Sequence, residues 1–576
     1  MNPFASVIMP NDENQLIECV PNFSEGRDMA KIKEITDEIE KAEGVRLLNV
    51  DPGKATNRTV VTFVGRPSAV IQAAYSAIKK ASEILDMSTH KGEHPRMGVT
   101  DVCPLIPIAN ITMEQTSVFA NILGEIVGND LGIPVYMYES SAKTPERKNL
   151  ATIRADEYEG FSKKIGNSEW KPDYGPQIMN IKSGTTAIGA RDFLVAYNVN
   201  INTTSVKRAN AIAFDIRENG RVKNDPKTNK PLLDTDGNAI RIPGKCKSVK
   251  AIGWFIDEYE IAQISMNLTD INATPLHIAF DACCDSAHQR GMRVTGSELV
   301  GLVPKSVLVD AGKYFLEKQN RSIGVAEDEL IHIAVRTLGL DELSPFDPKT
   351  RVIEYLLKER NEDKLVDKTL VKFANETASE SPAPGGGSIS AYVGTMGIAL
   401  GTMVANLSAA KNGWEKQFSY FSQKAWEGQQ LKDHLLDLVD ADTLAFNKIM
   451  DATRLPKITV EDNTARDKAI SEATINAIEV PLKVMRTSYL AMELIAAMAS
   501  KGNPNSVSDA GVGALCMRTA VEGAYLNVLI NCKDFDDTAY VTQATKEANQ
   551  LLADAKTKEE AILQTVRIII SGGQSI

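Results

Sequence analysis

The sequence predicts two successive α/β units in the N-terminal half and an all-α helical bundle in the C-terminal domain. Strand and helix patterns alternate in the first half, and strand patterns stop near residue 366. A chain of 576 residues is also too long for one hydrophobic core, so several domains are expected. Alternating strands and helices are typical of α/β layers, whereas consecutive helices separated by short breaks are typical of a bundle.

The first α/β unit is predicted from two strands and a helix. Gly44–Asp51 has the pattern of a strand that ends in a loop, and Thr59–Val64 has that of a strand closed by a glycine and a proline. Apolar residues then recur at helical spacing from Val70 to Leu85. This pattern predicts an amphipathic helix that packs on a sheet.

The second α/β unit is predicted from Phe193–Asn202 and Ile261–Thr269, where apolar residues alternate with uncharged polar ones. Rows of amides and hydroxyls have two interpretations, a solvated sheet face or the wall of a ligand tunnel. The segment between these strands, 217–247, is rich in glycine, proline and charged residues. It is therefore predicted to be a surface loop or an extended hairpin.

The domain boundaries follow from changes in composition. Prolines break the pattern after Ser344, a charged connector follows at 360–364, and helical patterns then continue with breaks at 411–413 and 501–505. We expect α/β subdomains at residues 1–190 and 191–343, a linker at 344–365 and the all-α domain at 366–576.

Charge and cysteine content argue against several functions. A formal net charge of -11 disfavours a nucleic-acid partner over the whole surface. The seven cysteines include no CxxC pair and no Cys/His group with zinc spacing, which fits a reducing cytoplasm and predicts no metal site. The N-terminal residues lack the basic start and apolar run of a signal peptide. We therefore expect a cytoplasmic protein.

The uncharged stretch between Glu380 and Lys411 has two interpretations. Its small-residue spacing at Gly397 and Gly401 occurs in membrane-spanning helices that dimerise, and also in buried helices that approach a neighbour closely. Glycines, threonines and an asparagine dilute its apolar character. The sequence therefore favours a buried helix of a bundle and no membrane partner.

His90 and His94 share an unusual context, the run Thr89–Gly98. Its glycines and proline prevent a helix, so this is not a helical zinc motif, and a stiff loop is expected. Two imidazoles beside Glu93 would suit proton transfer, because histidine titrates near neutrality. A polar loop with structural histidines is the alternative. Asp51 follows a predicted strand, at the end where α/β ligand sites tend to lie, and a simple turn carboxylate is its alternative.

The helical half offers two further candidates. On the predicted helix Leu431–Met450, Asp442 occupies the missing position of an apolar stripe, where burial would raise the pKa of its carboxyl group and suit a proton donor. A structural ion pair or a helix–helix hydrogen bond is the alternative. Pro384–Ser388 precedes the uncharged helix, and free amides at a helix start bind carboxylates. A flexible helix entry is its alternative. The stripe consists of Leu431, Leu435, Leu438, Phe446 and Ile449.

Two sets of motifs resemble a known family. The first set resembles glutamate formiminotransferase and consists of Glu18–Gly26, His90–Gly98 with Asp101–Pro104, and Gly296–Pro304. The second set resembles formimidoyltetrahydrofolate cyclodeaminase and consists of Ala383–Ser388, Val439–Asp442 and Gly502–Asp509. The motifs cover nearly the whole chain, in the fused order of the bifunctional formiminotransferase–cyclodeaminase family.

The resemblance implies a role for each site. His94 would be the acid and base of the transferase, Asp51 a carboxylate in the same site, and Asp442 the catalytic residue of the cyclodeaminase. The implied folate-binding residues are Gly175, Pro176, Gln177, Ile178, Met179, Asn180, Ile181, Lys182, Ser183, Gly184, Gly244, Lys245 and Cys246. The implied cyclodeaminase ligand loop is Gly385, Gly386, Gly387 and Ser388.

The resemblance also implies a reaction and an assembly. A formimino group would pass from N-formimino-L-glutamate to tetrahydrofolate, a co-substrate that can carry a polyglutamate tail. The product would then cyclise to 5,10-methenyltetrahydrofolate with loss of ammonia, in histidine degradation and without a metal. Two similar α/β subdomains with a tunnel between them would form the transferase, the helical domain would dimerise, and dimers would build a ring-like octamer. The alternatives are a folate-binding oligomeric scaffold and a member with only one active half.

This chain departs from the family pattern at two places. The insertion before Gly244 is longer than in vertebrate-like members, which could alter how that folate segment closes. Lys245 stands where arginine is expected. Lysine offers a point charge in place of a planar fork, so we expect a different grip on carboxylates.

Overall fold

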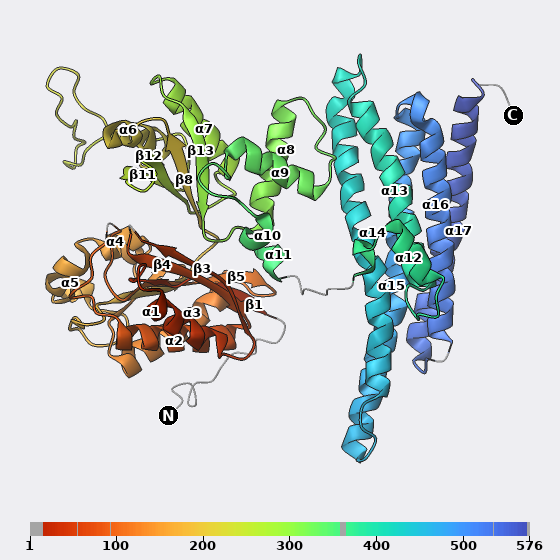
Figure 1. The fold of residues 1–576 in the computed structure, drawn as a ribbon, viewed down its shortest axis with the longest axis horizontal. Helices are drawn as coiled ribbons and strands as arrows, with labels where there is room; N and C mark the ends of the chain where they lie inside the picture. Colours follow the sequence, from red (N-terminus) through yellow and green to blue (C-terminus); the bar gives the residue numbers. More distant parts are fainter. Residues whose placement is uncertain (1–14, 55, 93, 358–363, 534, 573–576) are drawn as a thin grey trace. The chain divides into compact units, whose positions relative to one another are not determined.

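The computed structural model describes residues 15–54, 56–92, 94–357, 364–533 and 535–572, which form two compact units. The first unit contains the chain up to residue 308 together with 335–358, and the second contains 309–334 and the chain from 359 onward. The sheets lie in the first unit, and the second is helical (Figure 1). This confirms the predicted fold class. Glu93 and most of the predicted charged connector lie outside the described residues.

The first subdomain is built on a mixed sheet. Its strands are β1 (Leu16–Cys19), β2 (Asn22–Phe23), β3 (Val45–Gly53), β4 (Arg58–Gly65), β5 (Thr100–Ala109), β6 (Val135–Glu139) and β7 (Thr186–Ala190). The strand order is β1-β4-β2-β5-β7-β6, with β3 paired to β4. The pairs β5–β7 and β6–β7 are parallel, and the others are antiparallel. The helices are α1 (Met29–Glu40), α2 (Pro67–Ile84), α3 (Met113–Leu131), η1 (Pro145–Arg147), α4 (Leu150–Arg154), α5 (Glu157–Ile165) and η2 (Ser168–Trp170).

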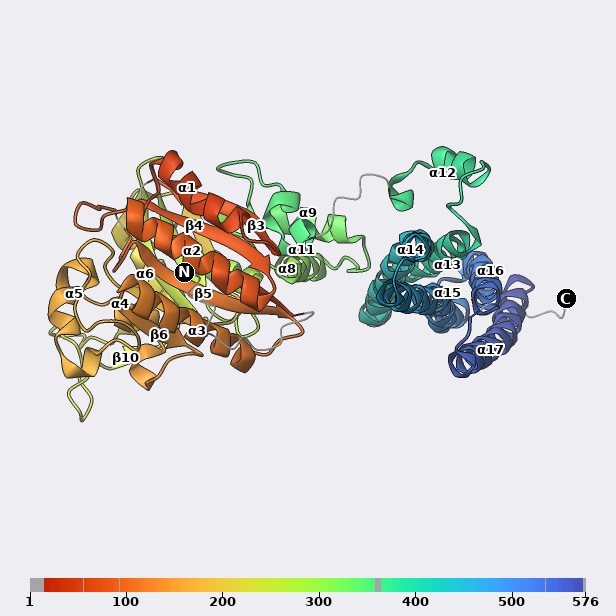
Figure 2. The same ribbon diagram turned by 90° about the horizontal axis from the view of Figure 1, so that it is seen from below.

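The two faces of this sheet are covered by different helices. Helices α1, α2 and α3 lie against one face (Figure 2), where they share a core with alternate residues of the strands. Opposite residues of β5, β6 and β7 form a second core with α4 and α5. Helix α2 begins at Pro67, whose fixed backbone suits a first helical position, and buries the predicted apolar face from Val70 to Ala81.

The second subdomain contains a four-stranded antiparallel sheet in the order β11-β12-β8-β13. The segment between α6 and β11 forms the predicted hairpin, in which Arg241 pairs with Val222. The strands are β8 (Val195–Ile201), β9 (Arg221–Val222), β10 (Arg241–Ile242), β11 (Val249–Ile256), β12 (Ile261–Leu268) and β13 (Val294–Val300). The helices are α6 (Val206–Ile216), α7 (Leu276–His288), α10 (Pro348–Arg351) and α11 (Ile353–Leu357).

Three members of the uncharged polar rows predicted around β8 and β12 are buried in this sheet, whereas Asn202 and Asn267 of the same rows are exposed. The exposed fractions of Asn198, Asn200 and Gln263 are 6%, 0% and 1%. Gln263 donates to Asn200 at 2.8 Å, and Asn200 donates in turn to the Glu342 carboxylate at 2.6 Å. Asn198 donates to Glu298 at 3.2 Å. The solvated-face interpretation is therefore wrong for these residues, because buried amides need partners and find them in one another and in two carboxylates.

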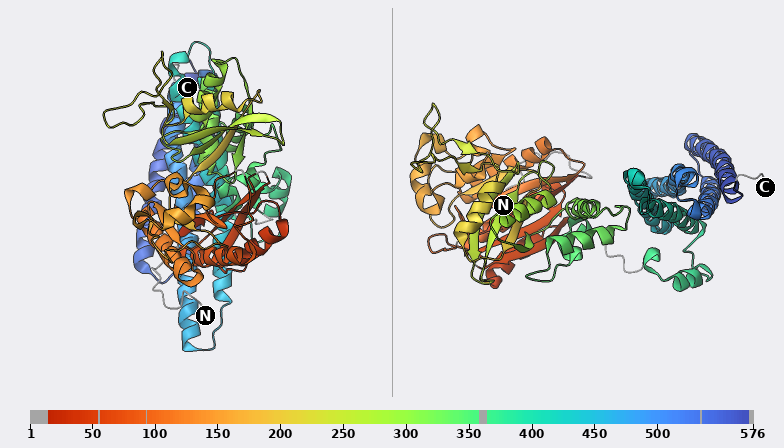
Figure 3. Two further views of the ribbon diagram at one scale, coloured as in Figure 1. Left: turned by 90° about the vertical axis from the view of Figure 1, so that its left-hand side faces the viewer. Right: turned by 90° about the horizontal axis from the view of Figure 1, so that it is seen from above.

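The second unit is a bundle of long helices. Its elements are α8 (Lys305–Lys318), which begins in the first unit, α9 (Glu327–Leu338), which ends there, η3 (Leu365–Asp367), α12 (Leu370–Thr377), α13 (Gly386–Ala409), η4 (Glu415–Gln417), α14 (Phe418–Thr453), α15 (Val460–Lys501), η5 (Pro504–Ser506), α16 (Val507–Cys532) and α17 (Thr538–Ile570). Helices α13 to α17 run side by side (Figures 1 and 3). The predicted breaks at 411–413 and 501–505 separate α13 from α14 and α15 from α16.

The connection between α8 and α9 packs into this bundle, a contact that the sequence patterns did not indicate. Gly324 lies against α14, where a Cβ would come within 2.1 Å of the Ala425 side chain. The Gly324 carbonyl oxygen accepts from Asn406 at 2.8 Å and from Gln429 at 2.9 Å. Residues 309–334 thus belong to the helical unit although they precede the predicted linker.

Helix α13 is the uncharged helix of the sequence. Among the described helices, it alone is long and apolar enough to span a membrane by length and composition. However, 61% of its most apolar 18-residue stretch is buried inside the unit, as in the core helix of a bundle. Gly397 explains the close packing, since a Cβ there would come within 2.9 Å of Cys516 on α16.

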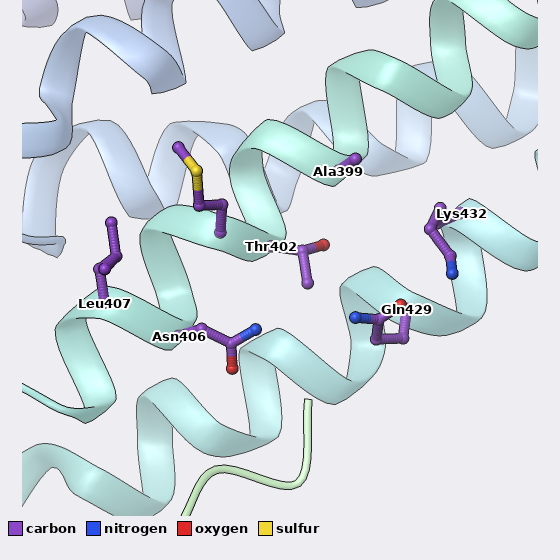
Figure 4. A pocket seen from close by; sticks show the side chains of 7 residues that line it. Ala399, Thr402, Asn406, Leu407, Gln429 and Lys432 are labelled. Atoms are coloured by element: carbon purple, nitrogen blue, oxygen red, sulfur yellow. The ribbon is translucent and has the colours of Figure 1, made fainter. Parts of the chain in front are cut away.

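A cavity of about 340 Å³ opens between α13 and α14 (Figure 4). Thr402, Asn406, Gln429 and Lys432 supply its polar lining. Asn406 and Gln429 also hold the Gly324 loop, so part of this lining has a structural role. Asp442 does not line this cavity.

Candidate active sites

The loop between α2 and β5 carries both histidines of the predicted transferase site. Gly92 lies against the backbone of Thr56, where a Cβ would come within 2.2 Å of the carbonyl oxygen. The His90 ring is engaged at both nitrogens. Its Nε2 lies 2.9 Å from the Asn57 carbonyl oxygen, and Arg96 Nε donates to its Nδ1 at 3.3 Å. These contacts support a structural role for His90 in holding the loop.

His94 has a different environment. Its Nδ1 lies 2.7 Å from the Pro95 carbonyl oxygen and 2.9 Å from Arg58 Nη1. A carbonyl oxygen only accepts and a guanidinium only donates, so the two contacts favour opposite tautomers. When Nδ1–H donates to Pro95, Nε2 has a free lone pair and can take a proton. When Nδ1 accepts from Arg58, Nε2–H can give one.

The charge state of His94 follows from its surroundings. Burial, and then the charges of Arg58 and Arg154, lower the pKa of His94 to about 3. The imidazole is therefore neutral at neutral pH, which is the form that a general base requires.

Asp101 holds this site together from β5. Its Oδ2 accepts from Arg58 Nη1 at 2.5 Å and from Arg154 Nη2 at 2.6 Å, and its Oδ1 accepts from the Met97 N–H at 3.0 Å. Burial alone would raise the pKa of Asp101, but the charges of Arg154 and Arg58 outweigh it and hold that pKa below its usual value. The carboxylate is thus ionised and fully buried between two guanidinium groups.

The first predicted folate segment, 175–184, lies beside the histidine loop. The N–H of Val99, the last residue of the histidine loop before β5, donates to the Ser183 carbonyl oxygen at 2.9 Å. Within the segment, Ile178 and Ile181 project into solvent with exposed fractions of 75% and 74%. Exposed apolar side chains next to a polar site offer contact area for a flat ring.

The second predicted folate segment follows the β9–β10 hairpin. The Lys245 N–H donates to the Asp215 carbonyl oxygen at 2.8 Å, and the Lys245 side chain is exposed. Cys246 is buried. Over the described ranges, no hydrogen bond or ion pair joins Gly244, Lys245 or Cys246 to the segment 175–184 or to the histidine loop. The role of this second segment therefore stays a prediction.

Asp51 connects the two α/β subdomains. Its Oδ2 accepts from the Gly301 N–H at 3.1 Å and lies 3.9 Å from Arg351. In the part of the chain that the structure describes, no hydrogen bond or ion pair joins Asp51 to His94. Its predicted role in the transferase site remains a prediction, and Asp101 occupies the position beside the histidine.

Asp442 is a residue of α14 and packs against the first turn of α13 in the helical unit. The Ser388 N–H donates to Asp442 Oδ2 at 2.9 Å, and the Ser388 hydroxyl lies 3.2 Å from the same oxygen. Burial raises the pKa of Asp442 and outweighs the two Ser388 hydrogen bonds, which lower it. The predicted direction of this shift is confirmed, and the carboxyl group is suited to carry a proton.

Gly387 brings the carboxylate close to the helix backbone. A Cβ at this position would come within 2.1 Å of Asp442 Oδ1. The same helix start faces Asn527 of α16, whose Nδ2 lies 3.3 Å from the position of a Cβ on Gly386. Gly385 is the N-cap residue, with Ser388 one turn later. The predicted ligand loop and Asp442 are thus brought together.

The apolar stripe predicted around Asp442 is correct in part. Leu435 and Leu438 are buried, but Phe446 is 44% exposed, so its assignment to the buried stripe is wrong. Asp442 contacts the first turn of α13, and Phe446 follows it one turn later on α14. The ends of α14 and α15 extend beyond the other helices of this unit (Figure 1). Asp440 accepts from the Leu365 N–H at 2.7 Å and so helps to dock η3.

Arg58, Asp101 and Arg154 were not predicted as site residues. They come from β4, β5 and α4, and no short motif contains them together. A charged residue inside the apolar strand β5 was the available signal, because buried carboxylates need charged partners. Over the described ranges, no group of three or more His, Cys, Asp or Glu side chains could hold a metal ion.

Family models match three consecutive parts of the chain. The formiminotransferase domain, N-terminal subdomain, matches residues 16–191, and the formiminotransferase domain matches 196–358. The formiminotransferase-cyclodeaminase model matches residues 369–550. The three matches follow the order in which the two α/β subdomains and the helical bundle occur.

Known proteins resemble the whole chain and each half. The formimidoyltransferase-cyclodeaminase of Gallus gallus is 41% identical over 550 residues, which are 95% of this chain and 98% of that protein. The glutamate formimidoyltransferase of Thermoplasma acidophilum is 40% identical over 304 residues, 52% of this chain and 92% of that protein. The methenyltetrahydrofolate cyclohydrolase of Methylorubrum extorquens is 37% identical over 201 residues, 35% of this chain and 97% of that protein. The chain belongs to the formiminotransferase–cyclodeaminase family.

Proposed function

We propose that the α/β unit transfers the formimino group of N-formimino-L-glutamate to tetrahydrofolate, and that the helical unit closes the product to 5,10-methenyltetrahydrofolate with release of ammonia. The observation that carries this proposal is that each unit has its own proton-transfer group. A neutral imidazole lies in the first unit, and a carboxyl group with a raised pKa lies in the second. The formimidoyltransferase-cyclodeaminase that matches nearly the whole chain supports both reactions, and the glutamate formimidoyltransferase that matches the α/β half supports the first.

In the transferase, the N5 amine of tetrahydrofolate attacks the amidine carbon of the donor. The developing N5–H⁺ gives its proton to His94 Nε2, with Nδ1–H held by the Pro95 carbonyl group. The same imidazole then returns the proton to the glutamate nitrogen as the C–N bond breaks. Arg58, 2.9 Å from Nδ1, supports the tautomer in which Nε2 bears the proton.

In the cyclodeaminase, the N10 amine attacks the formimino carbon that is attached to N5. A proton must move from N10 to the amino group before ammonia can leave. Asp442 relays that proton, since its raised pKa lets it give a proton and recover one from N10. Ser388 holds the carboxylate in place through its N–H and hydroxyl groups.

Separate assays of the two half-reactions test this proposal. Full-length protein given N-formimino-L-glutamate and tetrahydrofolate should release glutamate. The same protein given 5-formimidoyltetrahydrofolate alone should form methenyltetrahydrofolate and ammonia. If the second reaction is absent and the first is present, this chain has one active half. If both are absent and folate still binds, the scaffold alternative holds.

The pH dependence of the transferase should lack an acidic limb near the ordinary histidine pKa. His94 stays neutral down to about pH 3, so kcat/KM should remain flat as pH falls from 8 to about 5.5. In the unfolded chain, His94 binds a proton near the ordinary histidine pKa of about 6.5, whereas in the folded protein it binds one only near pH 3. The free energy of unfolding should therefore decrease as pH falls from about 6.5 toward 3. The measurement is kcat/KM against pH, with circular dichroism at each point. A fall in kcat/KM with a midpoint near pH 6.5, in protein that circular dichroism shows to be folded, would contradict the assignment of His94 as the neutral base.

Substitution of Gly387 with alanine should impair the cyclodeaminase selectively. The new methyl group would displace the Asp442 carboxylate, because a distance of 2.1 Å to Oδ1 is shorter than any van der Waals contact. Formation of methenyltetrahydrofolate from 5-formimidoyltetrahydrofolate should fall by about tenfold or more, or about 1.4 kcal/mol in activation free energy. Gly511→Ala on α16 is the control, since it lies outside the ligand loop and its Cβ would come no closer than 3.2 Å to another residue, the Val566 side chain. Equal losses in both variants would contradict the role given to this contact.

Hydrolysis of the methenyl product is a second candidate activity of the helical unit. The observation that favours it is the similarity of this half to a methenyltetrahydrofolate cyclohydrolase over 97% of that relative. Water would attack the methenyl carbon where ammonia leaves in the forward reaction, and Asp442 would take the proton. Incubation with 5,10-methenyltetrahydrofolate tests this activity. Loss of its absorbance that is faster with the wild-type protein than with Asp442→Asn would support it.

We also propose a cytoplasmic homo-oligomer, in which dimers of the helical unit assemble into a ring-like octamer that accepts polyglutamated folate. Exposed apolar side chains on long helices support an assembly, among them Leu490, Leu526 and Ile530 with exposed fractions of 58%, 60% and 62%. Native mass spectrometry of the full chain tests the octamer. A monomer at micromolar concentration would contradict it.

A further inference from the structure

The transferase site contains more positive than negative charge. Arg58 and Arg154 share one carboxylate, that of Asp101, and His94 is neutral at neutral pH. The exposed fractions of the Arg58 and Arg154 side chains are 11% and 13%. Among the described residues, no other carboxylate lies within ion-pair distance of either guanidinium group. The cluster therefore carries a net charge of about +1 in a largely buried position, where an uncompensated charge is costly.

Arg154 also has an unused hydrogen-bond donor. Its Nε is buried and has no partner among the described residues. Its Nη2 is used by Asp101, and Arg58 uses Nη1 for Asp101 and Nε for Asn22. A buried donor without a partner costs free energy unless a ligand satisfies it. A surplus of charge together with an unused donor is what a carboxylate ligand would complete.

We propose that Arg58 and Arg154 bind the α-carboxylate of the amino acid that donates the formimino group. This inference rests on the proposed function and adds substrate-binding residues to it. Arg58 Nη1 lies 2.9 Å from the His94 ring, so a carboxylate on this arginine pair lies close to the imidazole. The donor has such a group, because its α-carboxylate is joined through one carbon to the nitrogen that leaves.

The carboxylates of folate fit this position less well. They lie beyond the aminobenzoyl ring, far from the N5 atom that reacts beside His94. A carboxylate of the folate tail could therefore reach the arginine pair only if N5 were removed from the imidazole. The arrangement thus favours the donor, and the two sources can be separated experimentally.

The test measures the steady-state kinetics of full-length Arg154→Gln with three substrates. N-formimino-L-glutamate has both donor carboxylates, and N-formimino-4-aminobutyrate lacks only the α-carboxylate. Tetrahydropteroate replaces tetrahydrofolate and lacks the folate tail. Arg154 is chosen because its described hydrogen bond is to Asp101 and none is to His94. Lys163→Gln, an exposed cation on α5, is the matched control. Cyclodeaminase activity on 5-formimidoyltetrahydrofolate shows that each variant is folded.

Arg154→Gln is expected to raise the KM for N-formimino-L-glutamate by about 10- to 100-fold, with kcat changed less than about threefold. With N-formimino-4-aminobutyrate, the KM values of the wild-type protein and of Arg154→Gln should differ by less than about threefold, because this donor lacks the carboxylate that Arg154 binds. Arg154→Lys should recover part of the loss. If Arg154→Gln does not fold, Arg154→Lys carries the test, with a smaller rise in KM that is again confined to the donor with an α-carboxylate.

Two results would overturn the inference. An equal loss of kcat/KM with both donors would mean that Arg154 acts only on the structure of the site. A higher KM for tetrahydrofolate but not for tetrahydropteroate would place the folate tail on the arginine pair. Failure of the proposed function itself is distinct, since the wild-type protein would then release no glutamate from N-formimino-L-glutamate.

Discussion

Replacement of His94 with alanine is expected to lower the kcat of formimino transfer by about 10²- to 10⁴-fold and to leave cyclodeamination unchanged. The imidazole is the group that moves protons between the attacking and leaving nitrogens. Its neighbours cannot replace it, because Arg58 is a permanent cation and Asp101 is an ionised carboxylate bound by two arginines. The measurement is glutamate release under saturating tetrahydrofolate, with 5-formimidoyltetrahydrofolate closure assayed on the same preparation.

His288→Ala is the matched control for this variant, because that histidine is exposed at the end of α7 in the same unit. Its transferase rate should equal that of the wild-type protein. Added imidazole should restore part of the activity of His94→Ala, as expected when a base is missing from an intact site. A His94→Ala variant that retains more than about a tenth of the wild-type transferase rate would contradict the role of His94. Loss of both activities in a folded variant would contradict separate sites.

Asp442→Asn is expected to lower cyclodeamination by about 10²- to 10⁴-fold while transfer continues, so that 5-formimidoyltetrahydrofolate accumulates. Asparagine preserves the shape of the side chain, and its amide oxygen can still accept from the Ser388 N–H. It cannot carry a proton to the departing ammonia. The loss should therefore be in kcat, with little change in the KM for the folate intermediate.

Asp437→Asn is the control for this substitution, since Asp437 lies on the same helix and is exposed. Its rate of methenyltetrahydrofolate formation should match that of the wild-type protein. The amount of 5-formimidoyltetrahydrofolate in quenched reactions distinguishes the two variants. An Asp442→Asn enzyme that closes the intermediate at the wild-type rate would show that the proton comes from another group.

Local periodicity was sufficient to predict the elements that bury one face. The helix from Val70 and the position of Asp442 on α14 were both recognised because apolar residues recur at the spacing of a helix turn. Phe446 shows the limit of this method. Periodicity identifies an apolar face, but only the tertiary arrangement decides whether another helix covers it, and the Phe446 side chain is left exposed.

Contacts between distant parts of the chain could not be predicted in this way. Arg58, Asp101 and Arg154 meet because β4, β5 and α4 converge, and their spacing in the sequence has no characteristic pattern. The amide rows of β8 and β12 were recognised, but their carboxylate partners Glu298 and Glu342 were not. Charged residues within apolar strands are the signal that sequence reasoning could have used more fully.

The most direct test of the two-site account is a stoichiometric assay of the complete reaction. Full-length protein is mixed with N-formimino-L-glutamate and tetrahydrofolate, and glutamate, methenyltetrahydrofolate and ammonia are measured in the same sample. Once the intermediate has reached its steady state, glutamate, methenyltetrahydrofolate and ammonia should form at equal rates, with glutamate in excess only by the amount of the intermediate. Glutamate that forms without methenyltetrahydrofolate or ammonia would contradict an active second site, and a sample in which none of the three forms would contradict the proposed function as a whole.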